Sequence, residues 1–276
     1  MAFAPWSDAM RWAIVVFTGI SKELKNTMNV VDQAQAARHH PHCAHHSKGE
    51  DCRVCQVRPL GICAVLEPDE WASIEQISQT VTFAERDTLV SETDPCAHFF
   101  SITAGVARLI RSLPDGRRQV MGFALPGDFL GLSLGKTWTF SVEAITAMTA
   151  CRFARHSIVN FVDQKPHFLM RMHEMASAEL NLAQDHMVLL GRLTAEEKIG
   201  TFLLEMRRRW ARIDGHSSSH VPLPMGRQDI ADYLGLTIET VSRTINQMQR
   251  ERHLVIVPDG IRLLDGAYFD ALSPSV

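Results

Sequence analysis

Residues 226–243 read GRQDIADYLGLTIETVSR, and this stretch decides the fold of the C-terminal part of the chain. The pattern predicts a short helix over 226–234, a tight turn at Gly235, and a second helix from 238 to about 250 with Thr237 as its N-cap. Two helices joined by a short turn that contains glycine are typical of a helix-turn-helix motif.

A β-hairpin is predicted directly after this motif. The apolar runs 254–257 and 261–264 are separated by Pro258-Asp-Gly, which is typical turn chemistry. A helix-turn-helix followed by a hairpin is a winged helix.

The second helix of such a motif presents its N-terminal residues to base edges in the major groove. Glu239 and Arg243 are four residues apart and share one face, with Ser242 beside them. Arginine can bind guanine through two hydrogen bonds, and glutamate can accept one from cytosine. An exposed salt bridge without function is the alternative, but the turn, the cap and the hairpin favour DNA reading. The candidate phosphate-binding residues are Thr237, Thr244, Asn246 and Arg250.

Two longer helices are predicted upstream. Residues 194–212 form an amphipathic helix with Thr194 as N-cap. Residues 168–190 contain neither glycine nor proline, and their apolar residues recur at spacings of three and four. Such a stripe is either core or a dimer seam, and polar residues on the other faces favour the seam. The predicted seam residues are Leu169, Met172, Met175, Ala176, Leu180, Ala183 and Met187.

Short apolar runs separated by glycine- and proline-containing turns fill the middle of the chain. This pattern of short strands and turns predicts a roll or barrel of antiparallel strands. The predicted strands are 81–83, 88–90, 98–102, 106–110 and 119–125, with a further pair within 141–153. A short helix is predicted on each side of the roll, over 68–79 and over 157–163.

Four of the six cysteines lie between Cys43 and Cys63. Cys52, Cys55 and Cys63 have the spacing Cys-x2-Cys-x7-Cys, in which thiolates two residues apart can bind one metal centre. Thiolates select zinc, copper(I) or an iron–sulfur cluster over calcium or magnesium. No clear secretory signal precedes them, which argues against disulfides and for the cytoplasm.

Histidines crowd around Cys43, a spare candidate ligand outside the compact spacing. A tract of this kind can bind zinc or haem, but a solvated polar leader is the favoured interpretation. Residues 1–42 are predicted to be a loosely held extension, with Met28 as an alternative start. The histidines are His39, His40, His42, His45 and His46.

Length, net charge and missing motifs limit the classes of function that the chain can have. The 276 residues suffice for two modest domains, and a net charge of −3 means that DNA binding must come from a local surface. The sequence contains no span of about 20 apolar residues, so no membrane helix is predicted. No nucleophile–base arrangement or phosphate loop is recognisable, so an enzyme is not expected.

Residues 226–243 resemble the DNA-reading signature of the Crp–Fnr superfamily, and the resemblance covers residues 65–270. Glu239-x-x-Ser242-Arg243 is similar to the Fnr branch, in which serine replaces the arginine of cyclic-AMP receptors. The resemblance implies an α+β fold with an N-terminal cyclic-nucleotide-binding-like β-roll, a long dimerisation helix and a C-terminal winged helix. It also implies that these three residues read TTGAT half-sites in an inverted repeat.

Fnr proteins hold an oxygen-labile [4Fe–4S] cluster on three N-terminal cysteines and one in the roll. The spacing of Cys52, Cys55 and Cys63 resembles the rhizobial FnrN/FixK form, and residues 143–151, EAITAMTAC, resemble the stretch with the roll cysteine. The resemblance therefore implies these three and Cys151 as ligands, and leaves Cys96 as a structural residue.

The expected function is oxygen-responsive regulation, mainly activation, of microaerobic and anaerobic genes, with double-stranded DNA, RNA polymerase and a second copy as partners. Cyclic-nucleotide control is not expected, because residues 126–135 lack the Gly-Glu pair and no arginine follows before Arg152. A zinc- or haem-binding signalling protein of the same fold is the alternative. The predicted divisions are an extension (1–42), a cysteine segment (43–66), a sensor roll (67–165), a dimerisation helix (166–191) and a winged helix (192–276).

Overall fold

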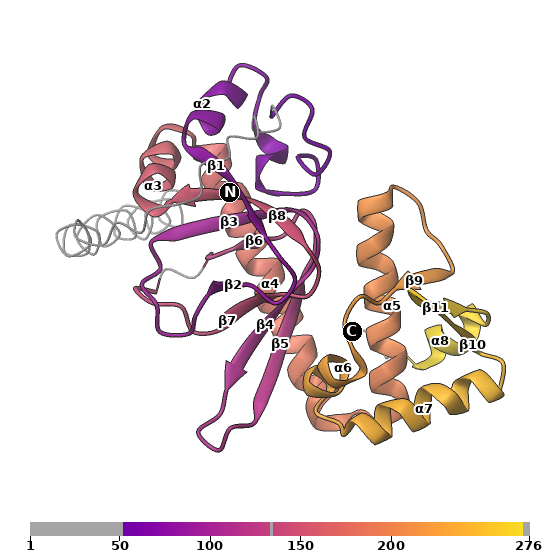
Figure 1. Ribbon diagram of the computed structural model, residues 1–276. Helices are drawn as coiled ribbons and strands as arrows, with labels where there is room; N and C mark the ends of the chain where they lie inside the picture. The colour runs from indigo at the N-terminus through magenta and orange to yellow at the C-terminus, as the bar shows by residue number, and fades with distance from the viewer. Residues whose placement is uncertain (1–51, 133–134, 273–276) are drawn as a thin grey trace, which may run out of the picture.

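The computed structural model describes residues 52–132 and 135–272. These residues form a β-roll and a C-terminal domain, and the long helix α4 (Pro166–Arg192) passes from one to the other (Figure 1). Within the described residues, no helix has the length and apolar character needed to span a bilayer.

The roll consists of two four-stranded antiparallel sheets that enclose an apolar core. Apolar strand residues fill this core: in β8, Met148, Ala150 and Phe153 are buried and the residues between them are less buried. The first sheet contains, in spatial order, β1 (Ser78–Phe83), β8 (Met148–Ala154), β3 (His98–Ala104) and β6 (Phe129–Leu130); the second contains β2 (Thr88–Val90), β7 (Ser141–Ala144), β4 (Ala107–Ser112) and β5 (Arg118–Ala124).

Short helices cover one end of the roll: η1 (Ile62–Val65), α2 (Trp71–Gln76) and α3 (Arg155–Gln164). The helix predicted over 68–79 is wrong at both ends, since only α2 is helical. Residues 78–83 instead pair with β8, with Ser78 opposite Phe153, and this pairing overrides the local helical pattern.

The C-terminal domain is the predicted winged helix. Its first helix, α5 (Ala195–Asp214), begins with a capping box: Thr194 Oγ1 accepts from Glu197 N (3.3 Å), and Glu197 Oε2 accepts from Thr194 N (2.8 Å). Gly235 links the helix-turn-helix in a left-handed conformation (φ 62°). The remaining elements are β9 (His220–Pro222), α6 (Arg227–Leu234), α7 (Ile238–Arg250), β10 (Leu254–Val257), β11 (Gly260–Leu263) and α8 (Gly266–Leu272).

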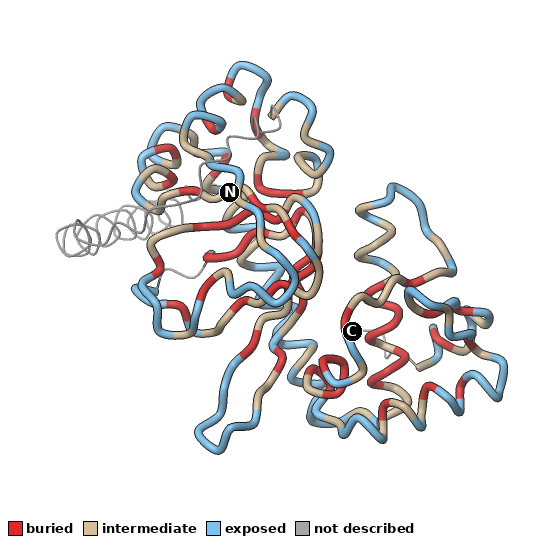
Figure 2. The backbone as a smooth tube through the Cα atoms, in the orientation of Figure 1, coloured by how far each residue is buried: buried red, intermediate tan, exposed pale blue. Residues whose placement is uncertain are grey.

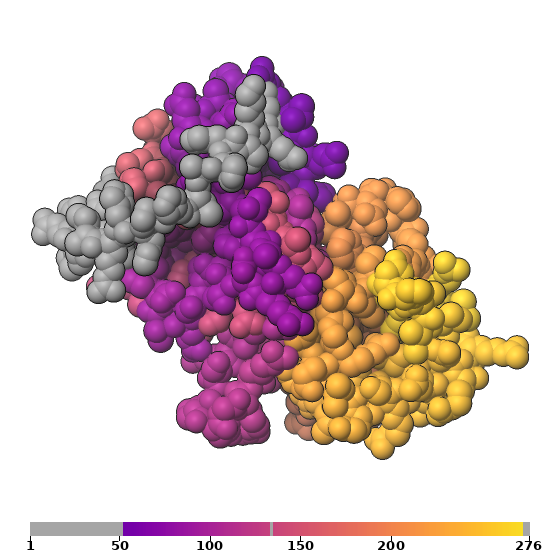
Figure 3. All heavy atoms as spheres, in the orientation of Figure 1, coloured from indigo at the N-terminus to yellow at the C-terminus, as the bar shows by residue number. Residues whose placement is uncertain are grey.

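The two domains share part of one hydrophobic core. Phe123 of β5 lies 5.4 Å, between ring centroids, from Tyr233 of α6 and 6.1 Å from Phe202 of α5. Figure 3 shows the roll in contact with the C-terminal domain, and Figure 2 shows buried residues continuing into α5 and α6. The roll residues in the core cluster of the C-terminal domain are Val106, Val120, Phe123 and Leu125.

Candidate DNA-reading helix and cysteine cavity

Helix α7 is strongly amphipathic and begins at the predicted cap. Thr237 Oγ1 accepts a hydrogen bond from Thr240 N (3.2 Å), which satisfies one of the free N–H groups at the helix start. The helix is anchored on its inner face by Val241, Ile245 and Met248, all buried. The sequence predicted Thr237 both as this N-cap and as a phosphate-binding residue, and the structure confirms the cap.

The outer face of α7 carries the predicted reading residues. Glu239 and Arg243 are exposed, and Ser242 is half-buried between them. Within the described ranges no ion pair joins Glu239 to Arg243, so both side chains are available to a ligand. Hydrogen bonds from its own backbone N–H and from Thr237 hold the pKa of Glu239 below its usual value. Of the phosphate-binding candidates, Asn246 and Arg250 are exposed and Thr244 is half-buried.

The C-terminal end of α6 is fixed by two residues from other helices. Lys198 of α5 is buried, and its Nζ donates to the carbonyls of Leu190 (3.2 Å) and Leu234 (3.1 Å). Burial lowers the pKa of Lys198. His186 of α4 stacks on Tyr233, with its Nε2 2.9 Å from the Tyr233 carbonyl. Sequence reasoning missed both residues, because a lysine or histidine on a helix usually indicates a solvated face.

The four predicted ligands, Cys52, Cys55, Cys63 and Cys151, line one cavity in the roll. Cys63 lies in η1 and Cys151 in β8, so the cavity joins the N-terminal segment to the sheet. Its other walls are mostly apolar. They include Val57, Trp71, Ile74 and Phe153, with Arg58, Ser78, Ser101 and Thr103 as polar members.

The thiol groups in this cavity influence one another. Burial, and then the neighbouring Cys52, Cys151 and Cys55, raise the pKa of Cys63 to about 12, while Arg58 acts in the opposite direction. A metal centre must therefore displace a firmly held proton from Cys63.

Arg58 holds the loop that carries the first two cysteines. Its Nη1 donates to the Cys52 carbonyl (2.6 Å), and its guanidinium lies 3.8 Å from the centroid of the Trp71 ring. The sequence gave no sign of this role.

The remaining cysteines differ. Cys96 is buried in the roll core and does not line the cavity, in keeping with its predicted structural role, and burial raises its pKa. Cys43 and the histidine tract lie outside the described residues. Among residues 52–132 and 135–272, no group of three or more His, Cys, Asp and Glu side chains is arranged around a single point where one metal ion would bind.

The predicted seam residues on α4 divide into two groups. Met172 and Met175 pack against the roll core, and Leu169 and Ala176 are half-buried. Further along, the apolar stripe is uncovered: Leu180 is 59% exposed and Met187 65% exposed, and Ala183 is also exposed.

The comparisons with known proteins agree with this architecture. A Crp-like helix-turn-helix domain matches residues 197–272, and a cyclic nucleotide-binding domain matches residues 80–165. The chain is 48% identical over 237 residues to the transcriptional activatory protein AadR of Rhodopseudomonas palustris, covering 84% of this chain and 99% of AadR. The chain belongs to the Crp–Fnr family. Its members are DNA-binding transcription regulators.

Two further relatives support the assignment. The nitrogen fixation regulation protein FixK of Bradyrhizobium diazoefficiens is 47% identical over 225 residues, which cover 82% of this chain and 94% of FixK. The solved structure of FixK2 from Bradyrhizobium japonicum has a TM-score of 0.68 at 34% identity, covering 72% of this chain and 99% of FixK2. The roll and the winged helix are therefore those of a Crp–Fnr regulator.

Proposed function

We propose that this regulator senses oxygen through a [4Fe–4S] cluster held by Cys52, Cys55, Cys63 and Cys151. The observation that carries the proposal is that these four thiols line a single cavity although one of them comes from a distant strand. Thiolates are the preferred ligands of iron–sulfur clusters. The apolar walls suit a site that limits access of water, which is one of the factors that tune such clusters.

A cluster bound there would supply an oxygen-labile link between the N-terminal loop and the roll. Without it, the loop depends on contacts of the protein itself, such as the stacking of Arg58 on Trp71. The segment with Cys63 also touches α4: η1 packs on this helix, and Arg171 of α4 donates to the Gly61 carbonyl (3.4 Å). Ordering of the cysteine segment would thus stabilise one position of α4.

The exposed part of α4 is proposed to form the dimer interface. Leu180 and Met187 lie on the predicted stripe and are uncovered in the single chain. A two-fold dimer would bury them and place two α7 helices against successive major grooves of a palindrome.

The DNA target is proposed to be an inverted repeat of TTGAT half-sites, read by Glu239, Ser242 and Arg243. Activation at such sites, with RNA polymerase as a partner, is supported by the names of AadR, a transcriptional activatory protein, and of FnrL of Cereibacter sphaeroides, a transcriptional activator protein that is 36% identical over 231 residues. The absence of cyclic-nucleotide binding stays a prediction, and calorimetry with cyclic AMP would check it.

Metal and sulfide analysis of protein purified without oxygen tests the proposal. Iron with an equal amount of inorganic sulfide is expected, together with charge-transfer absorption in the visible range that fades in air. Zinc without sulfide, or haem, would instead support a signalling protein of the same fold with a different cofactor.

A further inference from the structure

We propose that Arg108 and Arg118, two arginines of the sensor roll, are positioning residues for DNA reading. They do not lie on the DNA-reading helix. They hold α6, the first helix of the helix-turn-helix, through its carboxylates Asp229 and Asp232.

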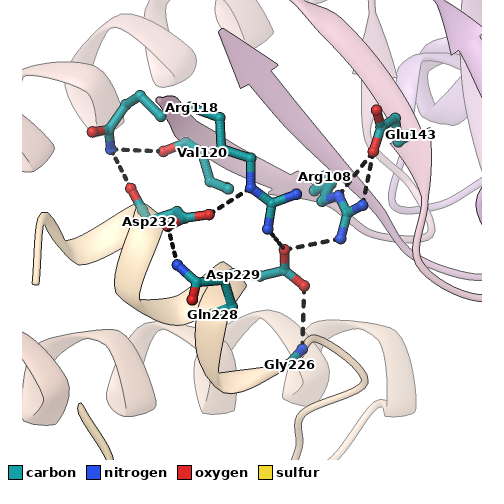
Figure 4. A network of polar contacts seen from close by, with 9 residues as sticks. Arg108, Arg118, Val120, Glu143, Gly226, Gln228, Asp229 and Asp232 are labelled. Atoms are coloured by element: carbon teal, nitrogen blue, oxygen red, sulfur yellow. Dashed lines mark hydrogen bonds and ion pairs between the residues drawn. The ribbon is translucent and has the colours of Figure 1, made fainter. Parts of the chain in front are cut away.

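The contacts form one continuous network, shown in Figure 4. Arg118 of β5 donates from Nη2 to Asp229 Oδ1 (3.0 Å) and from Nε to Asp232 Oδ2 (2.6 Å). Arg108 of β4 donates from Nη1 to the same Asp229 oxygen (2.9 Å). Glu143 of β7 accepts the other side of the Arg108 guanidinium, from Nε (3.1 Å) and Nη2 (2.8 Å), and so orients it toward α6.

Burial distinguishes this network from ordinary surface ion pairs. Asp229 is only 5% exposed, and its second oxygen, Oδ2, accepts from Gly226 N (3.2 Å) at the start of α6. Exposed ion pairs contribute little, whereas removing one partner of a buried pair leaves a charge without compensation. The roll arginines are therefore the counter-charges that the buried Asp229 requires.

The same face of α6 is held along its length. Gln119 Nε2 donates to the Asp232 carbonyl (2.5 Å), and Phe123 packs on Tyr233. At the far end of the helix, Lys198 and His186 bind its last carbonyls. Because only Gly235 and two further residues separate α6 from α7, the direction of α6 determines where α7 points.

The network positions the reading face and leaves it uncovered. Within the described residues, its contacts in the C-terminal domain are to residues 226–233, before α7 begins, and Glu239 and Arg243 remain exposed. Two reading helices must meet grooves one helical turn apart, about 34 Å. If the winged-helix domain could rotate freely against the roll, its orientation would have to be fixed on binding DNA. The entropy lost in fixing it would lower the affinity for DNA.

A charge-reversal cycle on the full chain tests the proposal. Arg118→Asp, Asp232→Arg and the double variant are compared with wild type, using fluorescence anisotropy with a duplex that the wild-type chain itself selects from a randomised pool. Each single variant should bind at least about tenfold more weakly, which corresponds to about 1.4 kcal/mol. The double variant should recover the part of this loss that belongs to the pair at positions 118 and 232, because opposite charges again face each other there, while the missing bond from position 118 to Asp229 is not restored. Arg117→Ala is the matched control, since Arg117 is exposed on the same hairpin and pairs with Asp115 of that hairpin.

The salt dependence of binding separates positioning from direct DNA contact. Loss of a phosphate contact lowers the slope of log affinity against log salt by about one. We expect an unchanged slope in Arg118→Gln, a milder variant that also serves if the reversal impairs folding in thermal melts. Unchanged or tighter DNA binding in both Arg118→Asp and Arg118→Gln, no recovery in the double variant, or a slope lowered by about one would each overturn the proposal. Because the duplex is chosen by the protein and no cofactor is assumed, these results do not depend on the proposed cluster or on TTGAT recognition.

Discussion

The DNA-reading helix α7 and the cysteine cavity are assembled in opposite ways. The reading residues Glu239 and Arg243 are one helical turn apart on a single capped helix. The cavity needs an N-terminal loop, η1 and the distant strand β8 to come together. One site is complete once a local helix forms, while the other exists only when the roll has folded.

Under the proposed function, the sensor site is separate from the reading helix and leaves the side chains of that helix unaltered. The reading face of α7 is exposed and shares no residue with the cavity, so we expect control to act on the position of α7 and on dimer formation. Helix α4 links the two regions, since η1 packs on it and His186 near its end binds α6, the helix that precedes α7. The predictions that follow test each site and the helix between them, beginning with the largest expected effect.

Cys63→Ser should remove the cluster completely. A serine hydroxyl is a far weaker ligand than a thiolate, and substitution of the other cavity cysteines, Cys52, Cys55 and Cys151, should have the same effect. Iron and sulfide content after anaerobic purification measures the effect. Cys96→Ser is the control: its side chain is buried outside the cavity, so it should keep the cluster. Loss of cluster in Cys96→Ser with retention in Cys63→Ser would assign the site to a different set of cysteines.

Leu180→Glu should yield a monomer that no longer binds the palindrome. The side chain is 59% exposed in the single chain, so the substitution leaves the fold intact but places a charge in the proposed interface, at a cost of several kcal/mol. Sedimentation velocity measures the dimer. Asn181→Glu, an exposed neighbour outside the apolar stripe, is the control. A full-strength Leu180→Glu dimer would place the seam elsewhere. Met175→Glu is less informative, because Met175 also packs against the roll core.

Arg243→Ala should abolish specific binding to the inverted repeat. A lost bidentate contact to guanine costs about 1–3 kcal/mol in each half-site. Glu239→Ala should instead relax the base preference. Arg250→Ala provides the contrast, because loss of a phosphate contact weakens binding to all sequences alike. Competition between specific and scrambled duplexes distinguishes these cases, and unchanged discrimination in Arg243→Ala would show that α7 does not read bases through this residue.

Glu70→Gln should lower the free energy of unfolding at neutral pH by about 1–2 kcal/mol. Hydrogen bonds from Lys165 Nζ, the Glu67 backbone N–H and His167 lower the pKa of Glu70 to about 2. A depressed carboxyl pKa stabilises the fold above the unfolded value of 4.5, and this contribution disappears as the pH falls toward 2.

Urea unfolding at several pH values checks the Glu70 prediction. The difference between wild type and Glu70→Gln should shrink between pH 4.5 and pH 2. Glu75→Gln removes an exposed carboxyl of α2, the helix that follows Glu70, and is the control for loss of a nearby surface charge. A difference that stays constant across this range would mean that Glu70 acts through packing alone.

Much of the winged helix could be predicted because its signals are local. The caps at Thr194 and Thr237 and the glycine at position 235 act within a few residues, and the structure confirms all three. The strand over 88–90 could be predicted because turn residues flank it, and the structure confirms it. Two short strands, β6 and β9, were not predicted, because two or three residues carry no periodic pattern. Helix α8 was also missed.

The long-range features could not be predicted in this way. Arg118 and Asp229 are 111 residues apart, and each alone has the appearance of a solvated charge in the sequence. The wrong C-terminal bound of the helix predicted over 68–79 has the same origin, because the pairing of Ser78 with Phe153 decides where the helix ends. Cys151 was placed at the site only by family resemblance, since nothing in its own neighbourhood indicates a ligand.

Oxygen-dependent DNA binding of wild type and Cys151→Ser tests the central claim most directly. Anisotropy with the inverted-repeat duplex is measured on anaerobic protein, before and after exposure to air, with iron and sulfide determined in the same samples. Wild type should bind tightly without oxygen and lose both cluster and affinity in air, while Cys151→Ser should contain no cluster and bind weakly in both conditions. Tight binding by Cys151→Ser that still responds to air would show that the sensor does not use the roll cysteine, and would contradict the account.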